Sequence, residues 1–398
     1  MYFIRCWRRS TAVVTSIRSI PAKRLLCSGS EDDTVFALSS GQGRCGVAVV
    51  RVSGPSSALA VRSLTRVLPA ARIASLRSII HPQTQELLDR GLVLWFPGPR
   101  SFTGEDCAEF HIHGGPAVIN GVLQALGSLP GLRPAEAGEF TRRAFSAGKL
   151  DLTEVEGLGD LIHAETEAQR RQALRQMAGD LGRIYQDWSD RLKRCLAHVE
   201  AFIDFSEDEL VEDGILNDVD VAVRQLQTQI GDHLSDQRRG ERLRTGVQVV
   251  IAGSTNAGKS SLLNMLTQRP AAIVSPTAGT TRDVVEVPLD MGGYPVLLSD
   301  TAGLRDTTDS VEQEGVRRAR QRCGDPLLGN PSLTQTRHRT HLQKSTEALH
   351  QYHHYRDVDL VLAAEGLRLA LSSLGRITGK VGAEEILDVI FKDFCIGK

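Results

Sequence analysis

Residues 247–266 read VQVVIAGSTNAGKSSLLNML, and this stretch decides the fold of the segment around it. The first six residues are apolar except for Gln248, which is typical of a strand buried in a parallel sheet. GSTNAGKS at 253–260 then matches the pattern G-x-x-x-x-G-K-S/T, and SLLNML at 261–266 predicts a helix. This order predicts an α/β unit with a phosphate-binding loop, because backbone N–H groups at a helix N-terminus bind anions.

The loop residues predict a nucleotide site. Gly253 and Gly258 let the backbone wrap around the β-phosphate, while Lys259 reaches the β- and γ-phosphate oxygens. The Ser260 hydroxyl can ligate Mg²⁺. GTTRD at 279–283 is a polar loop that can supply a threonine for Mg²⁺ and for sensing the γ-phosphate.

A hairpin and a DxxG motif follow. VVEVPLDMGGYPVLLSD at 284–300 predicts two strands joined by a Gly-Gly turn, with Asp300 beginning DTAG. Asp300 can support Mg²⁺ indirectly, and the Gly303 N–H can bond the γ-phosphate. This order is typical of GTPases; a P-loop ATPase is the weaker alternative.

Leu304 follows DTAG, where many GTPases place a glutamine that orients the attacking water. Leucine cannot do this, so hydrolysis needs another group. Glu312 could reach the site if its loop folds over. Its spacing within VEQEG also fits a solvated acid on a helix face, and spacing alone favours that reading.

Composition limits the other possibilities. The 398 residues suffice for two or three domains, and 41% hydrophobic with 24% charged residues allows most of the chain to fold around cores. The net charge of −1 gives no overall attraction to nucleic acid. Seven scattered cysteines without a CxxC pair argue against a zinc cluster or a disulfide framework. No apolar run is long enough to predict a membrane span.

The N-terminus differs from the rest. MYFIRCWRRSTAVVTSIRSIPAKRLLCSGS is basic, and the first acid is Glu31. This composition predicts a mitochondrial transit peptide over 1–33 and a location in the matrix. A disordered basic tail is the alternative.

Residues 34–150 predict a mixed α/β unit with strands at 46–54, 91–99 and 108–115. Apolar residues at steps of three or four from Leu174 to Phe202 predict one long amphipathic helix, with Cys195 and His198 packed along its stripe. A second stripe runs over 360–377, and a last helix is expected at 384–391.

Exposed apolar stripes need partners, so 151–246 and 323–398 are predicted to pack as one discontinuous helical domain. The segment 247–322 would be inserted between them. The histidines at 338, 341, 350, 353 and 354 fit a polar helix face better than a metal site, since acidic and thiolate ligands are lacking nearby.

QRCGDPLLGNPSL at 321–333 stands where the next strand of a GTPase is expected. No NKxD, the usual guanine-binding motif, occurs after Gly303, and only 304–332 remain before the helical pattern resumes. One strand–helix–strand unit needs about 30 residues, so the missing strands and helices do not fit.

We therefore predict an α/β and α fold whose inserted P-loop domain lacks its second half. Its phosphate-loop strand would lie at the sheet edge, and we expect 247–322 to be poorly stable, with weak or unselective GTP binding.

These motifs, together with SFTGEDCAEFHIHGGP at 101–116, AFSAGKLDLTEVE at 144–156 and the terminal FCIGK, resemble the MnmE/TrmE-type tRNA uridine-modification GTPases. The resemblance covers 34–320 and 333–398, and FCIGK is highly specific. With a transit peptide, the chain looks like a mitochondrial member.

The resemblance implies that the N-terminal domain dimerises and binds a formyl-tetrahydrofolate. The matching residues are Arg51, Glu109, Lys149 and Lys398. Cations for the folate carboxylates and pterin carbonyl, and a carboxylate for the pterin N–H groups, suit such a ligand. Cys395 would lie near the one-carbon site, with a catalytic role or a packing role.

The resemblance also implies a K⁺ ion in place of an arginine finger, held by Asn256, Ser275, Thr277 and Thr280. Thr281 matches the Mg²⁺ threonine and Glu312 the water-orienting glutamate, so that Glu312 and Lys259 are the candidate catalytic residues. The candidate nucleotide-binding residues are Gly253, Asn256, Ala257, Gly258, Lys259, Ser260, Ser261, Thr280, Thr281, Asp300, Thr301, Ala302 and Gly303.

The family works with an FAD-dependent partner subunit and attaches an aminomethyl-type group to C5 of the tRNA wobble uridine, with taurine the implied amine donor in mitochondria. Two readings stay open for this chain. It is either the GTPase of the mitochondrial complex, or a truncated, non-hydrolysing isoform that acts only as a dimerising, folate-binding module.

Overall fold

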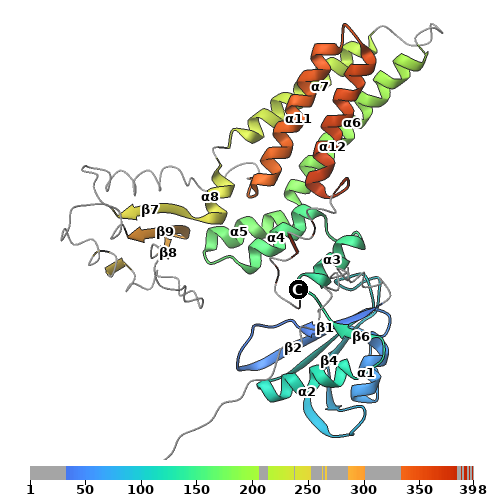
Figure 1. Ribbon diagram of the computed structural model, residues 1–398, viewed down its shortest axis with the longest axis vertical. Helices are drawn as coiled ribbons and strands as arrows, with labels where there is room; N and C mark the ends of the chain where they lie inside the picture. The colour runs from blue at the N-terminus through green and yellow to red at the C-terminus, as the bar shows by residue number, and fades with distance from the viewer. Residues whose placement is uncertain are drawn as a thin grey trace, which may run out of the picture.

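The computed structural model describes residues 33–205, 214–236, 238–251, 262, 265–266, 286–300, 333–382, 387, 390–391, 394 and 397. A six-stranded sheet lies at one end of the molecule and a bundle of long helices at the other, with a small sheet beside α5 (Figure 1). None of the described helices is long and apolar enough to cross a membrane.

The N-terminal unit is a sheet of order β3-β4-β5-β2-β1-β6, covered on one face by α1 and α2. Its elements are β1 (Thr34–Leu38), β2 (Cys45–Ser53), α1 (Ser57–Thr65), β3 (Ser75–Ile80), β4 (Leu87–Phe96), β5 (Cys107–Gly114), α2 (Pro116–Gly127), β6 (Leu132–Pro134) and α3 (Glu139–Ser146). Phe140 of α3 packs against Val35 and Ala37 on the opposite face of β1. The three predicted strands are confirmed as β2, β4 and β5, although β4 begins four residues early.

The helices of the C-terminal part are α4 (Leu152–Ile162), α5 (Glu167–Met177), α6 (Asp180–Phe205), α7 (Ile215–Leu234), α8 (Arg239–Thr245), α11 (Thr336–Tyr355) and α12 (Leu360–Thr378). α4 and α5 each begin with a capping box, at Asp151 and Thr166, as the patterns DLTE and TEAQ favour. α6, α7, α11 and α12 bury one shared core that includes Tyr185, Leu226 and Leu367. The two helical segments therefore pack together, as their apolar stripes predict.

The single long helix predicted from Leu174 onward is wrong. α5 ends at Met177 and α6 begins at Asp180, because Gly179 adopts a left-handed φ of +83° that breaks the helix. Leu174 and Met177 are consequently exposed large apolar side chains rather than part of the α6 core.

The remaining predictions for the helices are confirmed only in part. Cys195 is buried as predicted, whereas His198 is exposed, so its predicted packing role is wrong. The second apolar stripe is confirmed as α12. Of the expected last helix, residues 387, 390 and 391 are helical, and the rest lies outside the described residues.

The expected polar face of histidines is also wrong in part. On α11, His338 is fully buried and His341 is 8% exposed. His338 contacts Glu156 at 2.6 Å and His353 contacts Asp220 at 3.0 Å, so acidic partners come from distant parts of the sequence. No cluster that could hold a metal ion occurs in the part of the chain that the structure describes.

A second sheet has the order β7-β9-β8, formed by β7 (Val247–Ile251), β8 (Glu286–Met291) and β9 (Tyr294–Asp300). β8 and β9 are antiparallel and join at Gly292 and Gly293, both with positive φ, which confirms the predicted hairpin. β7 pairs with β9 in parallel and lies at the edge of this sheet, counting only strands within the described ranges.

Candidate functional site

The ends of β7 and β9 define where the predicted nucleotide site would begin. In the parallel register Ile251 pairs with Asp300, so the carboxyl ends of the two strands lie side by side. The sequence continues into GSTNAGKS after β7 and into DTAG from Asp300. Parallel α/β sheets bind ligands at this edge.

Most of the residues predicted for that site fall outside the described ranges. They are Gly253, Asn256, Ala257, Gly258, Lys259, Ser260, Ser261, Ser275, Thr277, Thr280, Thr281, Thr301, Ala302, Gly303 and Glu312. Asp300 is described as the last residue of β9.

A second candidate site lies on the N-terminal sheet. Arg51 of β2 and Glu109 of β5 are register partners, and both point away from the face that α1 and α2 cover. Arg51 Nε and Nη2 donate to Glu109 Oε1 at 3.1 and 2.9 Å. Both side chains are about four-fifths buried, at 19% and 20% exposure. Glu109 Oε2 also lies 3.3 Å from His111 Nε2.

Two aromatic rings flank the Arg51 guanidinium, which the sequence did not reveal. Its Cζ lies 5.3 Å from the centroid of Phe102 and 5.7 Å from that of Phe140. Such distances favour cation–π attraction. Phe102 belongs to the loop between β4 and β5, and Phe140 to α3, so both segments form walls around Arg51.

Lys149 is exposed and lies at the same loop. A Cβ added to Gly104 would be 3.5 Å from Lys149 Cε, and Gly104 has a φ of +85°. Three of the four predicted folate residues thus gather around one loop, although Lys149 makes no hydrogen bond to the Arg51–Glu109 pair.

The C-terminal motif reaches this region. Ser39 Oγ donates to the Gly397 carbonyl at 2.7 Å, and Ser39 N donates to Val49 O on β2, two residues before Arg51. Lys398 and Cys395 themselves lie outside the described residues. Among the described residues of FCIGK, Gly397 therefore lies beside Ser39, directly after β1.

The side chains of this site can bind a ligand that carries both anionic groups and N–H donors. Arg51 keeps Nη1 available beyond its bonds to Glu109, and Glu109 supplies a largely buried carboxylate. These residues fit the folate that the sequence motifs imply.

Comparison with known proteins agrees with this architecture. The family model "GTP-binding protein TrmE N-terminus" matches residues 34–149, and the model "MnmE helical domain" matches residues 152–395. This chain belongs to the MnmE/TrmE family. The second match continues on both sides of the small sheet, in keeping with the shared core of α6, α7, α11 and α12.

Several MnmE/TrmE relatives are similar over their whole length. The mitochondrial 5-taurinomethyluridine-tRNA synthase subunit GTPB3 of Danio rerio is 67% identical over 500 positions, covering 100% of both chains. The Homo sapiens protein of that name is 52% identical over 460 positions, covering 92% of this chain and 93% of its own. The tRNA modification GTPase MnmE of Parvibaculum lavamentivorans is 48% identical, covering 92% and 100%.

The alignment lengths carry further information. This chain has 398 residues, so an alignment of 500 positions leaves at least 102 of them (500 − 398) filled by the Danio rerio relative alone. At least 102 positions of that alignment therefore have no counterpart in this chain.

Proposed function

We propose that this protein is the GTP-binding and GTP-hydrolysing component of the mitochondrial complex that modifies C5 of the tRNA wobble uridine, with a taurinomethyl or carboxymethylaminomethyl-type product. The names of the GTPB3 and MnmE relatives support this reading. The structural observation that supports it is the pairing of Ile251, the end of the strand before GSTNAGKS, with Asp300, the first residue of DTAG. The word mitochondrial in the relatives' names supports a matrix location after removal of the basic N-terminal segment.

In the nucleotide site, the motif from Gly253 to Ser261 and the motif from Asp300 to Gly303 would hold GTP. Ser260 and Thr281 would hold Mg²⁺, and K⁺ would lie among Asn256, Ser275, Thr277 and Thr280. Lys259 and Glu312 would serve catalysis. Mg²⁺ and K⁺ supply charge stabilisation for phosphoryl transfer when bound.

In the N-terminal site, Arg51, Glu109, Lys149 and Lys398 would bind a 5-formyl-tetrahydrofolate or a related folate, with Cys395 nearby. The Arg51–Glu109 pair and the position of Gly397 support this assignment. The active form would be a homodimer working with an FAD-dependent partner subunit on mitochondrial tRNA.

The domains we propose are a folate-binding and dimerisation domain at 34–150, a helical domain at 151–246 and 323–398, and a partial GTPase domain at 247–322. The missing alignment positions and the edge location of β7 favour a second candidate function. It is a non-hydrolysing isoform that keeps only the folate-binding and helical parts.

Equilibrium binding of a fluorescent GTP analogue to the purified chain, competed with GTP and with ATP, tests the nucleotide site. Hydrolysis in K⁺ against Na⁺ buffer, with Glu312→Ala as the matched inactive variant, tests catalysis. K⁺-dependent hydrolysis lost in Glu312→Ala supports the enzyme. Folate binding without hydrolysis supports the non-hydrolysing isoform. Tight, GTP-selective binding would contradict the predicted loss of guanine recognition. Mass spectrometry of wobble uridine in cells that express only this chain measures the biological outcome.

A further inference from the structure

The loop at 97–106 forms one wall of the Arg51 site. Phe102 of this loop lies over the Arg51 guanidinium, and Gly104 lies against Lys149 and Ala147. The loop contains no helix or strand, so its position depends on the side chains that anchor it. The Ser101 hydroxyl donates to the Glu105 carbonyl, and Asp106 Oδ1 accepts from Gly98 N at 2.9 Å, which closes the loop on itself.

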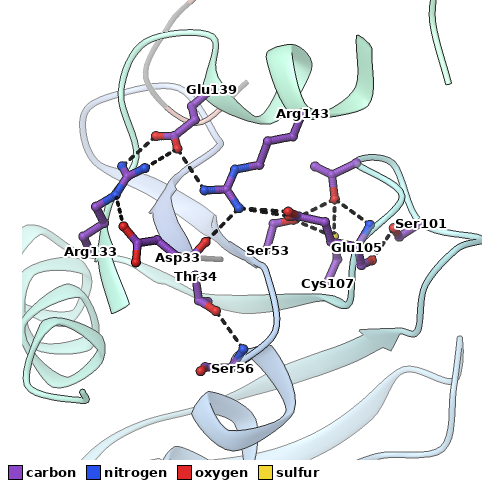
Figure 2. A network of polar contacts seen from close by, with 11 residues as sticks. Asp33, Thr34, Ser53, Ser56, Ser101, Glu105, Cys107, Arg133, Glu139 and Arg143 are labelled. Carbon is purple, nitrogen blue, oxygen red and sulfur yellow. Dashed lines mark hydrogen bonds and ion pairs between the residues drawn. The ribbon is translucent and has the colours of Figure 1, made fainter. Parts of the chain in front are cut away.

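A buried polar cluster lies under the loop (Figure 2). Ser53 Oγ, on the same strand as Arg51, donates to Glu105 Oε2 at 2.6 Å and lies 2.7 Å from Thr103 Oγ1. Cys107 Sγ lies 3.2 Å from Ser53 Oγ and 3.1 Å from Thr103 Oγ1. Ser53 and Thr103 are fully buried, and Cys107 is 4% exposed. The loop thus covers a thiol that is almost fully buried.

Arg143 of α3 connects this cluster to the rest of the unit (Figure 2). Its Nη1 donates to both Glu105 oxygens, at 3.0 and 3.1 Å, and to the Asp33 carbonyl at 2.8 Å. Its Nη2 donates to Glu139 Oε1 at 3.0 Å, and its side chain is only 12% exposed. A planar guanidinium is needed to satisfy these acceptors from three segments together.

Arg133 occupies the outer end of the same network. It donates to both oxygens of Glu139, at 2.9 and 2.7 Å, and to Asp33 Oδ2 at 3.3 Å, with 32% of its side chain exposed. Burial would raise the pKa of the Glu139 carboxyl, but hydrogen bonds from Arg133 and Arg143 outweigh this and hold that pKa below its ordinary value. Arg133 makes no contact with loop 97–106 among the interactions described, so it differs from Arg143 in this one respect.

We propose that Arg143, acting through Glu105, is a positioning residue that holds loop 97–106 over the Arg51–Glu109 pair and thereby sets the affinity of the folate site. This rests on the proposed function for the identity of the ligand, but not for the anchoring of the loop. Without Arg143, the Glu105 carboxylate would keep only its bond to Ser53, and Phe102 would no longer be fixed against Arg51.

The test compares Arg143→Gln with Arg133→Gln in the full-length protein. Both variants remove a guanidinium from Glu139 and from the Asp33 segment, but only the first releases Glu105. Calorimetric titration with 5-formyl-tetrahydrofolate should show Kd raised about tenfold or more in Arg143→Gln, as expected for loss of hydrogen bonds to a charged group. Arg133→Gln should stay within about twofold of wild type. Arg143→Lys should be intermediate, since one ammonium keeps the charge but not the fork.

Cysteine alkylation, mapped by mass spectrometry, gives a readout that does not involve folate. Cys107 lies under the loop, Cys195 is buried in the helical core, and Cys45 is exposed. Arg143→Gln should speed labelling of Cys107 about tenfold or more while Cys195 keeps its wild-type rate, because only the loop opens. Cys45 reports the activity of the reagent in each sample.

The outcomes are separable. Slow Cys107 labelling in Arg143→Gln, or equal effects of Arg143→Gln and Arg133→Gln on either readout, would overturn the positioning role. Failure of the wild-type protein to bind 5-formyl-tetrahydrofolate would overturn the proposed ligand, while Cys107 labelling would still decide whether Arg143 anchors the loop. Faster labelling of Cys195 together with Cys107 would mean general unfolding and would also count against a local role.

Discussion

Replacing Glu156 by glutamine is expected to destabilise the helical bundle by about 3–5 kcal/mol, the usual cost of removing one partner of a buried ion pair. Glu156 lies on α4 with its side chain 5% exposed. One of its oxygens accepts from Arg337 Nε and Nη2 at 3.0 and 2.9 Å, and the other lies 2.6 Å from His338 Nε2. The contact between Glu156 and His338 joins residues 182 positions apart in the sequence, one before and one after the small sheet.

The size of the expected destabilisation follows from the charge of the Glu156 side chain. Burial alone would raise the pKa of the Glu156 carboxyl, but the charges and hydrogen bonds of His338 and Arg337 outweigh it, and that pKa lies below its ordinary value. The group is therefore a carboxylate at neutral pH. A neutral amide would leave the Arg337 charge without its counter-charge and would turn an N–H toward a donor.

Thermal unfolding of the full-length protein, followed by far-ultraviolet circular dichroism, measures the effect. At about 2–4 °C per kcal/mol for a unit of 150–250 residues, the midpoint should fall by roughly 6–20 °C. The control Glu365→Gln removes a carboxylate that is 52% exposed and 3.3 Å from Arg368. Exposed pairs contribute about 0.2–1 kcal/mol, so its midpoint should move by at most a few degrees.

A double variant sharpens this test. Glu156→Gln combined with His338→Gln replaces the carboxylate–imidazole contact by two amides that can bond each other, so the double loss should be smaller than the sum of the single losses by about 0.5–3 kcal/mol. Additive losses, or equal shifts for Glu156→Gln and Glu365→Gln, would refute the argument that this pair stabilises the joined helical segments.

Three further predictions follow from burial and close packing. Burial lowers the pKa values of His233 and His341 to about 4 from an ordinary 6.5. Between pH 6.5 and 4 these two histidines are protonated only in the unfolded chain, so the free energy of unfolding should be full above pH 6.5 and fall as the pH drops toward 4. Thermal midpoints at several pH values should show this fall, and the fall should be shallower in His233→Gln. A Cβ on Gly366 would lie 2.9 Å from backbone atoms of α11, whereas a Cβ on Gly231 of α7 meets nothing within 4 Å. Gly366→Ala should therefore cost about 1–3 kcal/mol and Gly231→Ala should gain about 0.5–1 kcal/mol in denaturant unfolding, and shifts of the same sign would contradict this. The mature N-terminus in mitochondria should lie at or before Asp33, at least one residue earlier than the boundary of 1–33 predicted from composition, because Arg133 and Arg143 bond the Asp33 carboxylate and carbonyl. N-terminal peptide mapping that begins beyond Asp33 would count against it.

Local patterns predicted much of this architecture. Alternation of apolar and polar residues identified β5, and the Gly-Gly pair identified the turn between β8 and β9. Helical spacing identified α12 and the packing of the two helical segments. Each of these signals lies within one short stretch, where the period of burial determines the element.

Features set by distant contacts could not be predicted in this way. The steps of three and four residues continue through Gly179, so periodicity does not reveal the break between α5 and α6. His338 looks polar in sequence and is buried because Glu156, far away in the chain, gives its Nε2 a partner at 2.6 Å. Phe102 and Phe140 likewise meet Arg51 only after β2, the loop and α3 have come together.

The attachment of the small sheet explains why a shortened insert would be compatible with an intact helical core. On the outgoing side, Arg244 of α8 bonds Asp160 of α4 at 2.6 Å. On the returning side, Leu333 is fully buried in the helical core, and Thr334 Oγ1 donates to Gln176 of α5 at 2.7 Å.

Both crossings line one pocket of about 170 Å³, so the chain leaves and returns at neighbouring points. Between these two anchors, the Ala168 N–H of α5 also donates to Gly293 O in the turn between β8 and β9 at 3.1 Å. The entropy of the chain between the two anchors changes slowly with its length. Loss of half a GTPase domain from the proposed insert would leave these anchors in place. Folate binding and the Glu156 stability effect should therefore survive in this chain even if guanine selectivity does not, and measuring all three on one protein sample separates the two candidate functions.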